Sequence, residues 1–269
     1  MSEIFQVLNS QLQPEPGWLK LAKSTVGYEL EEARKRLLSC FEVIAAWIDR
    51  LPPLACPEGY VVLEVVLHPQ RLRRVDCPRQ FLNYLNFTIL GSRKIKICPS
   101  KTFSVKSDLT DLDSPELGAP DPDLSHTISL YVAGRLEELS AIDQKIMAIQ
   151  PDSPPAREIT GLESVNPLDP ADCLKSLGPN QAAYYEVTLH QLPNAGENFP
   201  LSQFLAYAKA TGFKASSELE LKIDGLFFVP VSGSLSGLRY LAQFVFVREI
   251  KEVGHLRSLC GDQLKGVES

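Results

Sequence analysis

Short runs in which apolar and polar residues alternate, as in strands, are separated by segments in which apolar residues recur at helical spacing. The order of these two patterns along the chain occurs twice. In its first copy, the pattern predicts strands at 60–68, 89–97, 127–132 and 157–165, with helices from Pro78 and at 136–146. In its second copy, the pattern predicts strands at 184–190, 213–223, 226–231 and 245–253, with helices at 201–210 and 235–244. Right-handed crossovers turn this β-α-β-β-α-β order into a four-stranded antiparallel sheet with two helices on one face. We therefore expect an α+β chain of two tandem ferredoxin-like units.

Four short motifs support a duplication, because each occurs once in each copy and the four follow one another in the same order. They are EVxLH at 64–68 and 186–190, QFLxY at 80–84 and 203–207, VxGxLxxL at 132–139 and 231–238, and REI at 157–159 and 248–250. A catalytic site rarely needs two similar halves. The repeat therefore favours a paired scaffold over a single enzyme core.

An N-terminal segment over 1–55 precedes the repeats and is expected to be helical. Its apolar stripe runs through Leu30, Leu37, Phe41, Ile44, Ile48 and Leu51. Packing against the first repeat or against a partner helix would cover this stripe, and the second option makes the chain an oligomer or scaffold. The expected domains are a helical segment 1–55, a first repeat 56–166 with an acidic loop 107–125, a linker 167–182, a second repeat 183–257 and a C-terminal tail 258–269.

Charge is unevenly distributed in a chain whose net charge is −6. Residues 60–106 hold nine Lys and Arg against two Asp and Glu, whereas residues 107–172 hold three against fourteen. Either the acidic loop lies near a basic face of its own domain, or each patch meets a separate partner. The first account is the simpler one.

The usual signatures of catalysis and cofactor binding are missing from the sequence. There is no nucleotide-binding glycine motif, no metal-ligand spacing and no CxxC pair among the six cysteines. His68 and His190 end the first strand of each repeat, which fits a position determined by the fold, with a duplicated base as the alternative. No apolar run is long enough to cross a bilayer, and the N-terminus does not resemble a secretion signal. We expect a cytoplasmic protein that is not an enzyme and holds no metal or cofactor.

Nucleic-acid binding is an alternative, since RNA-recognition motifs share this strand order and stack bases on aromatic residues of the sheet. The candidate aromatic residues are Tyr60, Tyr131, Tyr185 and Phe228. The candidate phosphate-binding residues are Arg71, Arg73, Arg74, Arg79, Arg93 and Lys94. The third strand of the second repeat, however, lacks the basic residue and the second spaced aromatic of such motifs. This alternative is therefore the less favoured one.

Several motifs, taken together, resemble the N-terminal region of large bacterial subtilisin-like serine proteases. They are His68-Pro69, Gly91-Ser92-Arg93, the run from Leu226 to Val231, the run from Leu241 to Arg248, and His255-Leu256-Arg257. The resemblance covers about residues 55–258. Two positions depart from it, since Lys251 stands in the second arginine slot of the last strand and Gly254-His255 replaces a Met-Pro pair.

Members of that group are often encoded beside an AAA-type ATPase in defence loci, and their protease domain follows the region that is similar here. This chain has no counterpart of the protease triad, so the resemblance implies a non-catalytic module for regulation or target sensing in antiviral defence. It implies a subtilisin-like protease as partner, in the same chain or a separate one, and an AAA ATPase as a further partner. Subtilisin propeptides share the β-α-β-β-α-β order, which implies that the second sheet docks on the protease with the C-terminal tail near its cleft. The expected partner-binding residues are His68, Gly91, Ser92, Arg93, Arg248, His255, Leu256 and Arg257.

Overall fold

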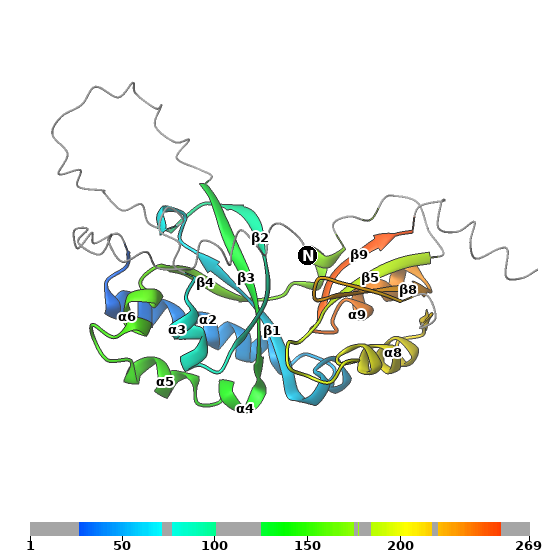
Figure 1. The fold of residues 1–269 in the computed structure, drawn as a ribbon, viewed down its shortest axis with the longest axis horizontal. Coiled ribbons are helices and arrows are strands. Elements are labelled where there is room, and N and C mark those ends of the chain that lie inside the picture. The colour runs from blue at the N-terminus through cyan, green and yellow to red at the C-terminus, as the bar shows by residue number, and fades with distance from the viewer. Residues whose placement is uncertain are drawn as a thin grey trace, which may run out of the picture.

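The chain folds into two antiparallel sheets in the computed structural model (Figure 1). The structure describes residues 27–71, 77–100, 125–174, 177, 184–216 and 220–253. The first sheet has the order β2-β3-β1-β4, with β1 Tyr60–Leu67, β2 Thr88–Ile97, β3 Ser125–Arg135 and β4 Leu162–Pro167. The second has the order β6-β8-β5-β9, with β5 Tyr184–His190, β6 Lys214–Ala215, β8 Leu226–Ser232 and β9 Val247–Glu252. A short strand, β7 Leu221–Ile223, pairs with β8 outside this path. The prediction of a mixed α+β chain with antiparallel sheets is confirmed.

Helices cover one face of each sheet (Figure 1). In the first half they are α2 Leu30–Ile48, α3 Arg79–Tyr84, α4 Leu136–Leu139, α5 Ile142–Ala148 and α6 Pro154–Ile159. In the second half they are α8 Leu201–Ala210 and α9 Leu238–Leu241, and α7 Pro170–Cys173 lies between the halves in sequence. Single 3-10 turns occupy Pro53–Ala55, Pro57–Gly59, Pro69–Arg71 and Leu235–Gly237.

The apolar stripe of α2 is buried in the chain's own first half. Leu37, Phe41 and Ile44 share a core with strand residues such as Leu63 and Val65. This is the first of the two arrangements expected for the stripe, so these side chains are not available to a partner helix. Residues 1–26 of the expected helical segment lie outside the described residues.

The motif REI has different structures in the two halves, which corrects the expectation of a strand at 157–165. Residues 157–159 end helix α6, whereas residues 248–250 lie in strand β9. The helix forms because Ser153 accepts a hydrogen bond from the backbone N–H of Ala156 and Pro154 occupies the first helical turn. Strand β4 begins only at Leu162.

Other boundaries also shift from those expected. The helix predicted at 136–146 is divided into α4 and α5, the helix predicted at 235–244 is reduced to α9 and a preceding 3-10 turn, and the strand predicted at 213–223 is divided into β6 and β7. The expected Asp224-Gly225 turn is confirmed, with φ of 49° and 77° at these residues joining β7 to β8. The linker expected at 167–182 holds α7, and most of the acidic loop and the whole tail lie outside the described residues.

Part of the second face of the first sheet packs on the other half of the chain. Val62, Tyr131 and Ala133 belong to the same core as Tyr185 and Phe246 of the second half. A backbone hydrogen bond of 3.1 Å from Val245 N–H to the carbonyl of Ala55 adds to this junction. The junction between the halves is therefore an apolar core with polar groups at its margin.

Candidate functional site

The junction brings together three of the expected partner-binding residues: Gly91, Arg93 and Arg248. A Cβ atom added to Gly91 would lie 3.8 Å from Nη1 of Arg248. Strand alternation places Ser92 on the opposite side of β2, where it is exposed. His68 lies in a separate cluster described below, and His255, Leu256 and Arg257 lie outside the described residues.

Two guanidinium groups share one aromatic ring at this junction. The guanidinium carbons of Arg93 and Arg248 each lie 5.5 Å from the ring centre of Tyr131. Arg93 donates to Oε1 of Glu64 through Nε at 2.9 Å and Nη2 at 2.7 Å, and its Nη2 lies 3.8 Å from Oδ2 of Asp172. These groups enclose a cavity of about 20 Å³, which suffices for a single water molecule. Burial raises the pKa of the Tyr131 hydroxyl, so the ring stays neutral.

His190 lies beside this junction as a fully buried imidazole. Its ring centre is 4.6 Å from that of Tyr131, and neither ring nitrogen has a hydrogen-bond partner among the described residues. Burial, and secondarily the charge of Arg248, lowers the pKa of His190 to about 3. A base with this pKa is poorly matched to proton transfer near neutral pH, so His190 does not fit a catalytic role.

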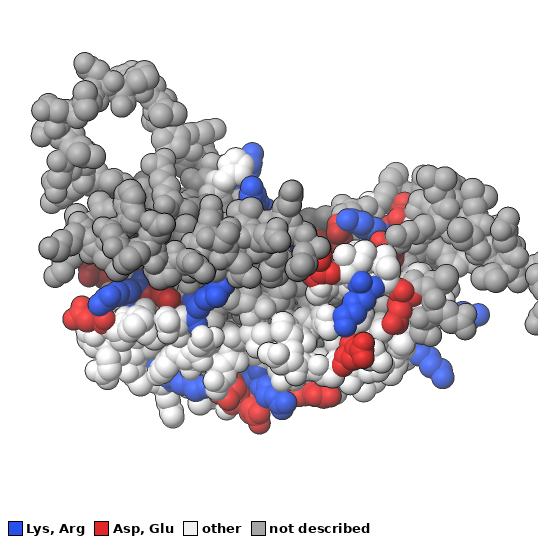
Figure 2. Space-filling model, viewed as in Figure 1, with Lys and Arg blue, Asp and Glu red and all other residues white. Residues whose placement is uncertain are grey.

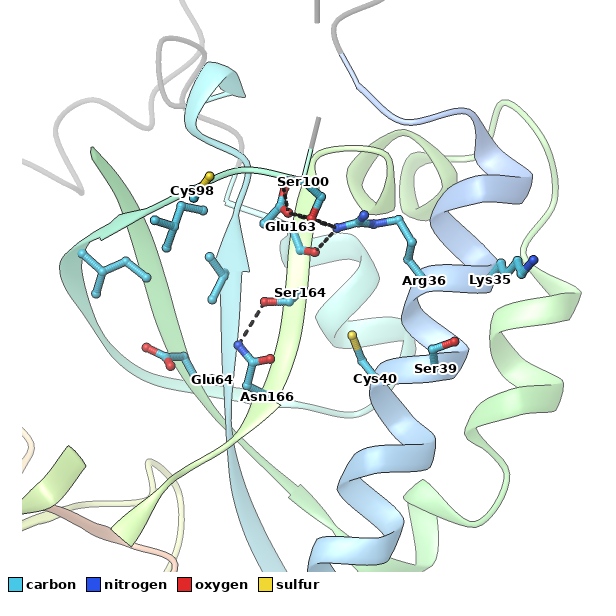
Figure 3. Close-up of a pocket in the computed structure, with 13 residues that line it drawn as sticks. Lys35, Arg36, Ser39, Cys40, Glu64, Cys98, Ser100, Glu163, Ser164 and Asn166 are labelled. Carbon is cyan, nitrogen blue, oxygen red and sulfur yellow. Dashed lines mark hydrogen bonds and ion pairs between the residues drawn. The ribbon is translucent and has the colours of Figure 1, made fainter. Parts of the chain in front are cut away.

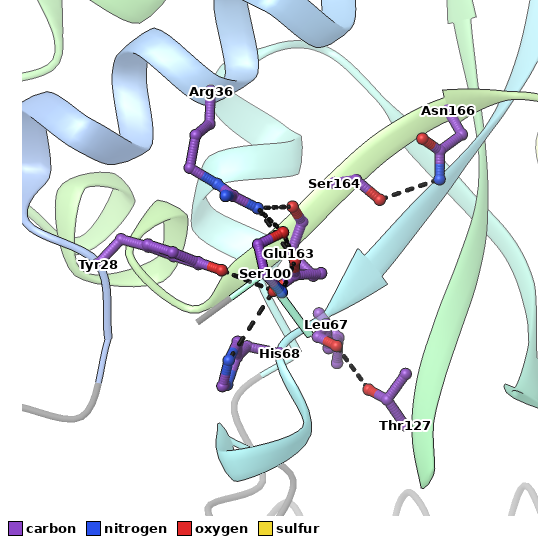
Figure 4. A network of polar contacts seen from close by, with 9 residues as sticks. All are labelled: Tyr28, Arg36, Leu67, His68, Ser100, Thr127, Glu163, Ser164 and Asn166. Carbon is purple, nitrogen blue, oxygen red and sulfur yellow. Dashed lines mark hydrogen bonds and ion pairs between the residues drawn. The ribbon is translucent and has the colours of Figure 1, made fainter. Parts of the chain in front are cut away.

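Four groups converge on the carboxylate of Glu163 in strand β4 (Figure 4). Tyr28 donates its hydroxyl at 2.7 Å, Ser100 its backbone N–H at 2.9 Å and Arg36 its Nη2 at 3.1 Å, while Nε2 of His68 lies 3.8 Å away. Burial raises the pKa of Glu163, but the hydrogen bonds from Ser100 and Tyr28 and the charge of Arg36 outweigh it and lower the pKa overall. The carboxylate is therefore a buried anion that ties three segments together.

The order of groups in this cluster argues against a nucleophilic triad. In such a triad the histidine lies between the serine and the carboxylate and takes the proton of the serine. Here the carboxylate of Glu163 lies between Ser100 and His68, and the Ser100 hydroxyl donates to that carboxylate. The cluster therefore does not have the order of a nucleophilic triad. Sequence reasoning missed the cluster. Its one sequence signal is an acidic residue between the core positions Leu162 and Val165.

Glu163 and Arg248 occupy matching backbone positions, because each is the extra residue of a β-bulge. In the pairing of β1 with β4, Val66 faces Ser164 and Leu67 faces Leu162, so Glu163 is passed over. In the pairing of β5 with β9, partners step from Glu249 to Val247 in the same way and pass over Arg248. Both clusters are therefore built around the same local irregularity.

A larger cavity of about 600 Å³ lies at the edge strand β4 of the first sheet, next to the Glu163 cluster, and is lined by residues of both α2 and the sheet (Figure 3). Helix α2 contributes Arg36 and Cys40, and the strands contribute Val66, Ile95 and Ser164. In the part of the chain that the structure describes, no three His, Cys, Asp or Glu residues are arranged to hold a metal ion. The described cysteines are free thiols, and burial raises the pKa of Cys173 to about 12.

The aromatic residues proposed for base stacking are not all accessible. Tyr131 and Tyr185 are buried at the junction and in the second core. On the face seen in Figure 2, basic and acidic side chains of the described residues are interspersed and form no patch of one sign. Nucleic-acid binding stays a prediction that these positions do not favour.

Comparisons with known proteins give little functional information. No family model matches the chain, and no curated protein matches it. Among solved structures, the chain is similar to the ligand-free regulatory subunit of aspartate kinase from Thermus thermophilus, with 10% sequence identity over 69% of this chain and 91% of that one, at a TM-score of 0.23. That score is too low to support an argument from the likeness. Within the described ranges, no helix is both long and apolar enough to cross a membrane.

Proposed function

We propose that this chain is a non-catalytic regulatory module built from two copies of a ferredoxin-like unit, and that it binds a subtilisin-like protease through its second sheet. The matching strand orders, the matching bulges and the shared EVxLH, QFLxY and VxGxL motifs support the duplication. The resemblance of residues 55–258 to the region in front of such proteases supports the choice of partner.

The observation that carries the proposal is a set of exposed apolar side chains on the second sheet. Its helices α8 and α9 cover one face only (Figure 1). On the other face, Tyr184, Leu221 and Ile223 are 56%, 44% and 47% exposed, and strand pairing places Leu221 beside the half-exposed Phe228. Surface aliphatic side chains that gather on one face are typical of a protein-binding site. On the corresponding face of the first sheet, Val62, Tyr131 and Ala133 pack on the second half.

This difference gives the two halves separate tasks. The first half presents the polar cluster and the larger cavity, so it is the sensing half of the module. The second half presents the free sheet face and leads into the C-terminal tail, so it contacts the protease. A tail bound as an added strand would occupy the cleft as a product does and inhibit the enzyme.

The test mixes the full chain with the subtilisin-like protease encoded nearest to it and measures co-elution and peptide hydrolysis. We expect a complex and reduced hydrolysis, and we expect a chain that lacks residues 256–269 to bind without inhibiting. The double variant Leu221→Asp with Ile223→Asp should weaken binding at least about tenfold, because it places two charges in the contact.

The matched control is Val43→Asp on α2, since Val43 is an equally aliphatic residue that is 59% exposed on the other half. We expect this variant to bind as the wild type does. Wild-type affinity in the double variant would overturn the assignment of the face. Unchanged hydrolysis and no co-elution of the wild type would overturn the proposal as a whole.

A further inference from the structure

The cavity beside α2 has the size and the lining of a small-molecule site. Its volume of about 600 Å³ lies within the range of roughly 300–1,000 Å³ that is common for ligand pockets. Val66, Ile95 and Ile97 give the cavity an aliphatic lining. Arg36 and Ser164, which are labelled in Figure 3, add a guanidinium and a hydroxyl. A ligand that fills it needs an apolar part and a polar head.

Arg36 has hydrogen-bonding capacity that its own chain does not use. Every hydrogen bond that it makes within the described residues comes from Nη2, which donates to the carbonyl and carboxylate of Glu163 and to the hydroxyl of Ser100. Its Nε is buried without a partner, and its Nη1 donates to no group in the same ranges. The guanidinium carbon lies 4.1 Å from the ring centre of Tyr28, so stacking fixes the plane of the group. A fixed guanidinium with free N–H donors is suited to bind a carboxylate.

The charges around the cavity also favour an anionic ligand. Glu163 is already paired with Arg36, and Glu64 with Arg93 at 2.7 Å, so neither carboxylate needs a cationic ligand. Lys35, whose side chain is directed outward at the rim, has no ion pair within the described residues (Figure 3). Among the charged lining residues that the structure describes, Lys35 is therefore the one left without an ion pair. A ligand with a single negative charge would neutralise it.

Two polar side chains on β4 offer a further contact for a carboxylate. Asn166 donates from Nδ2 to the hydroxyl oxygen of Ser164 at 2.9 Å. That bond leaves the hydroxyl hydrogen of Ser164 free to donate in turn. The hydroxyl and the guanidinium of Arg36 both line the cavity (Figure 3).

We propose that this cavity binds a carboxylate attached to a short aliphatic group. Arg36 and Ser164 hold the carboxylate, and Val66, Ile95 and Ile97 contact the aliphatic part. A medium-chain fatty acid and the C-terminal residue of an apolar peptide share this chemistry. The site lies in the first half of the chain and does not depend on the proposed docking of the second sheet.

Calorimetric titration of the full chain tests the proposal with three probes that share one tail: octanoate, 1-octanol and octylamine. We expect saturable binding of octanoate, at least about tenfold tighter than that of the neutral or cationic probe. A tripeptide Ala-Ala-Leu with a free carboxylate, compared with its amide, distinguishes the two sources. If the peptide acid binds more tightly than octanoate, the ligand is a peptide C-terminus. If octanoate binds more tightly than the peptide acid, the ligand is a fatty acid. Equal or tighter binding of octylamine, or no saturable binding of any carboxylate probe, overturns the proposal.

Matched variants locate the site. Lys35→Glu should weaken octanoate binding roughly fivefold, whereas Lys96→Glu, the same change at an exposed lysine on the other side of β2, should leave it unchanged. Ile97→Ser in the aliphatic wall should weaken binding, with Val43→Ser on the surface of α2 as its control. Circular dichroism and thermal melting of each variant separate loss of binding from loss of fold. Wild-type affinity in both Lys35→Glu and Ile97→Ser overturns the assignment to this cavity.

Discussion

The first and second halves place residues of opposite charge at the same β-bulge, and the two residues hold different parts of the molecule together. Glu163 binds Tyr28, Arg36 and Ser100, all of which belong to its own half. Arg248 instead lies against Tyr131 of the other half. One bulge closes a unit and the other joins two units. Two matching backbone positions can therefore make different contacts when a single side chain differs.

The histidines that end strands β1 and β5 show the same contrast. The backbone N–H of His68 donates to Gly161 at 3.0 Å, and that of His190 donates to Phe246 at 2.9 Å. The ring of His68, however, accepts a hydrogen bond from Gln70 and lies near Glu163, whereas the ring of His190 has no hydrogen bond within the described residues. The backbone position is shared, and the side-chain environment is not.

The largest effect is expected where the halves are most alike, at the glycine of VxGxL. A Cβ added to Gly134 would lie 2.3 Å from the ring of Phe87, and one added to Gly233 would lie 2.4 Å from the ring of Phe213. Gly134→Ala and Gly233→Ala should each lower the free energy of unfolding by about 3 kcal/mol, since a buried aromatic ring cannot move aside freely. Urea denaturation measures both values.

Two further variants control this prediction. Gly196→Ala adds a Cβ with nothing within 4 Å, so the free energy of unfolding should change by less than about 0.5 kcal/mol. Phe87→Leu in the Gly134→Ala background should restore part of the loss by relieving the contact. If Gly134→Ala is as stable as the wild type while Gly233→Ala is not, the two contacts are not equivalent.

The second effect tests the contrast between the bulges. Glu163→Gln should lower the free energy of unfolding by about 2–3 kcal/mol, because Arg36 then lacks its partner in a buried cluster. Arg248→Met should cost less than about 1 kcal/mol, since Arg248 is partly exposed and its ring contact with Tyr131 is 5.5 Å long. Thermal and urea denaturation of both variants measure the difference. Equal losses of unfolding free energy in the two variants would contradict the expectation that Glu163 contributes more to stability than Arg248 does.

The repeated motifs predicted the sheets because they report local requirements that either half must meet. The β-branched run before His68 predicted β1, and the glycines of VxGxL mark the contacts with Phe87 and Phe213. The motif REI failed as a predictor because Ser153 and Pro154 start a helix before it in the first half only. A three-residue match does not outweigh a helix cap.

The clusters were harder to predict from sequence than the strands. Glu163 and Arg248 become equivalent only through the bulge, which adds one residue to each strand and is set by pairing with a distant strand. The partners of Glu163 come from residues 28, 36 and 100, which no local spacing connects. Gly91, Arg93 and Arg248 were named from a sequence resemblance, and their meeting at one junction depends on how the halves pack.

The third prediction concerns the pH dependence of stability, which distinguishes the contribution of His190 in the second half from that of the Glu163 cluster in the first half. The ordinary pKa of His190, 6.5, applies to the unfolded chain, whereas the folded pKa is about 3. The unfolded chain therefore binds a proton first, and stability falls as pH decreases from about 6.5 toward 3, by up to about 2 kcal/mol at pH 5. His190→Leu should remove this part of the acid dependence in urea denaturation measured from pH 7 to pH 5.

Glu163 acts in a different pH range and provides the internal control. Its folded pKa lies below the ordinary value of 4.5, so its contribution is present above that pH and is lost as pH falls below it. Glu163→Gln should therefore keep the wild-type slope between pH 7 and pH 5 and flatten the curve only below about 4.5. An unchanged slope in His190→Leu between pH 7 and pH 5 would contradict the assignment to this imidazole.

The smallest effect concerns the residue that ends the first helix of each unit. Asn86 has φ of 61° and Gly212 has φ of 85°, and each comes directly before the phenylalanine that packs on the glycine of VxGxL. Glycine and asparagine tolerate this left-handed conformation better than residues with other side chains do. Asn86→Gly and Gly212→Asn should therefore each change the free energy of unfolding by less than about 0.5 kcal/mol, whereas Asn86→Ala and Gly212→Ala should each cost about 1 kcal/mol. Because Asn86 also donates to Glu138 at 2.9 Å, a loss in Asn86→Gly as large as that in Asn86→Ala would show that this side-chain bond, and not the backbone conformation, selects asparagine in the first half.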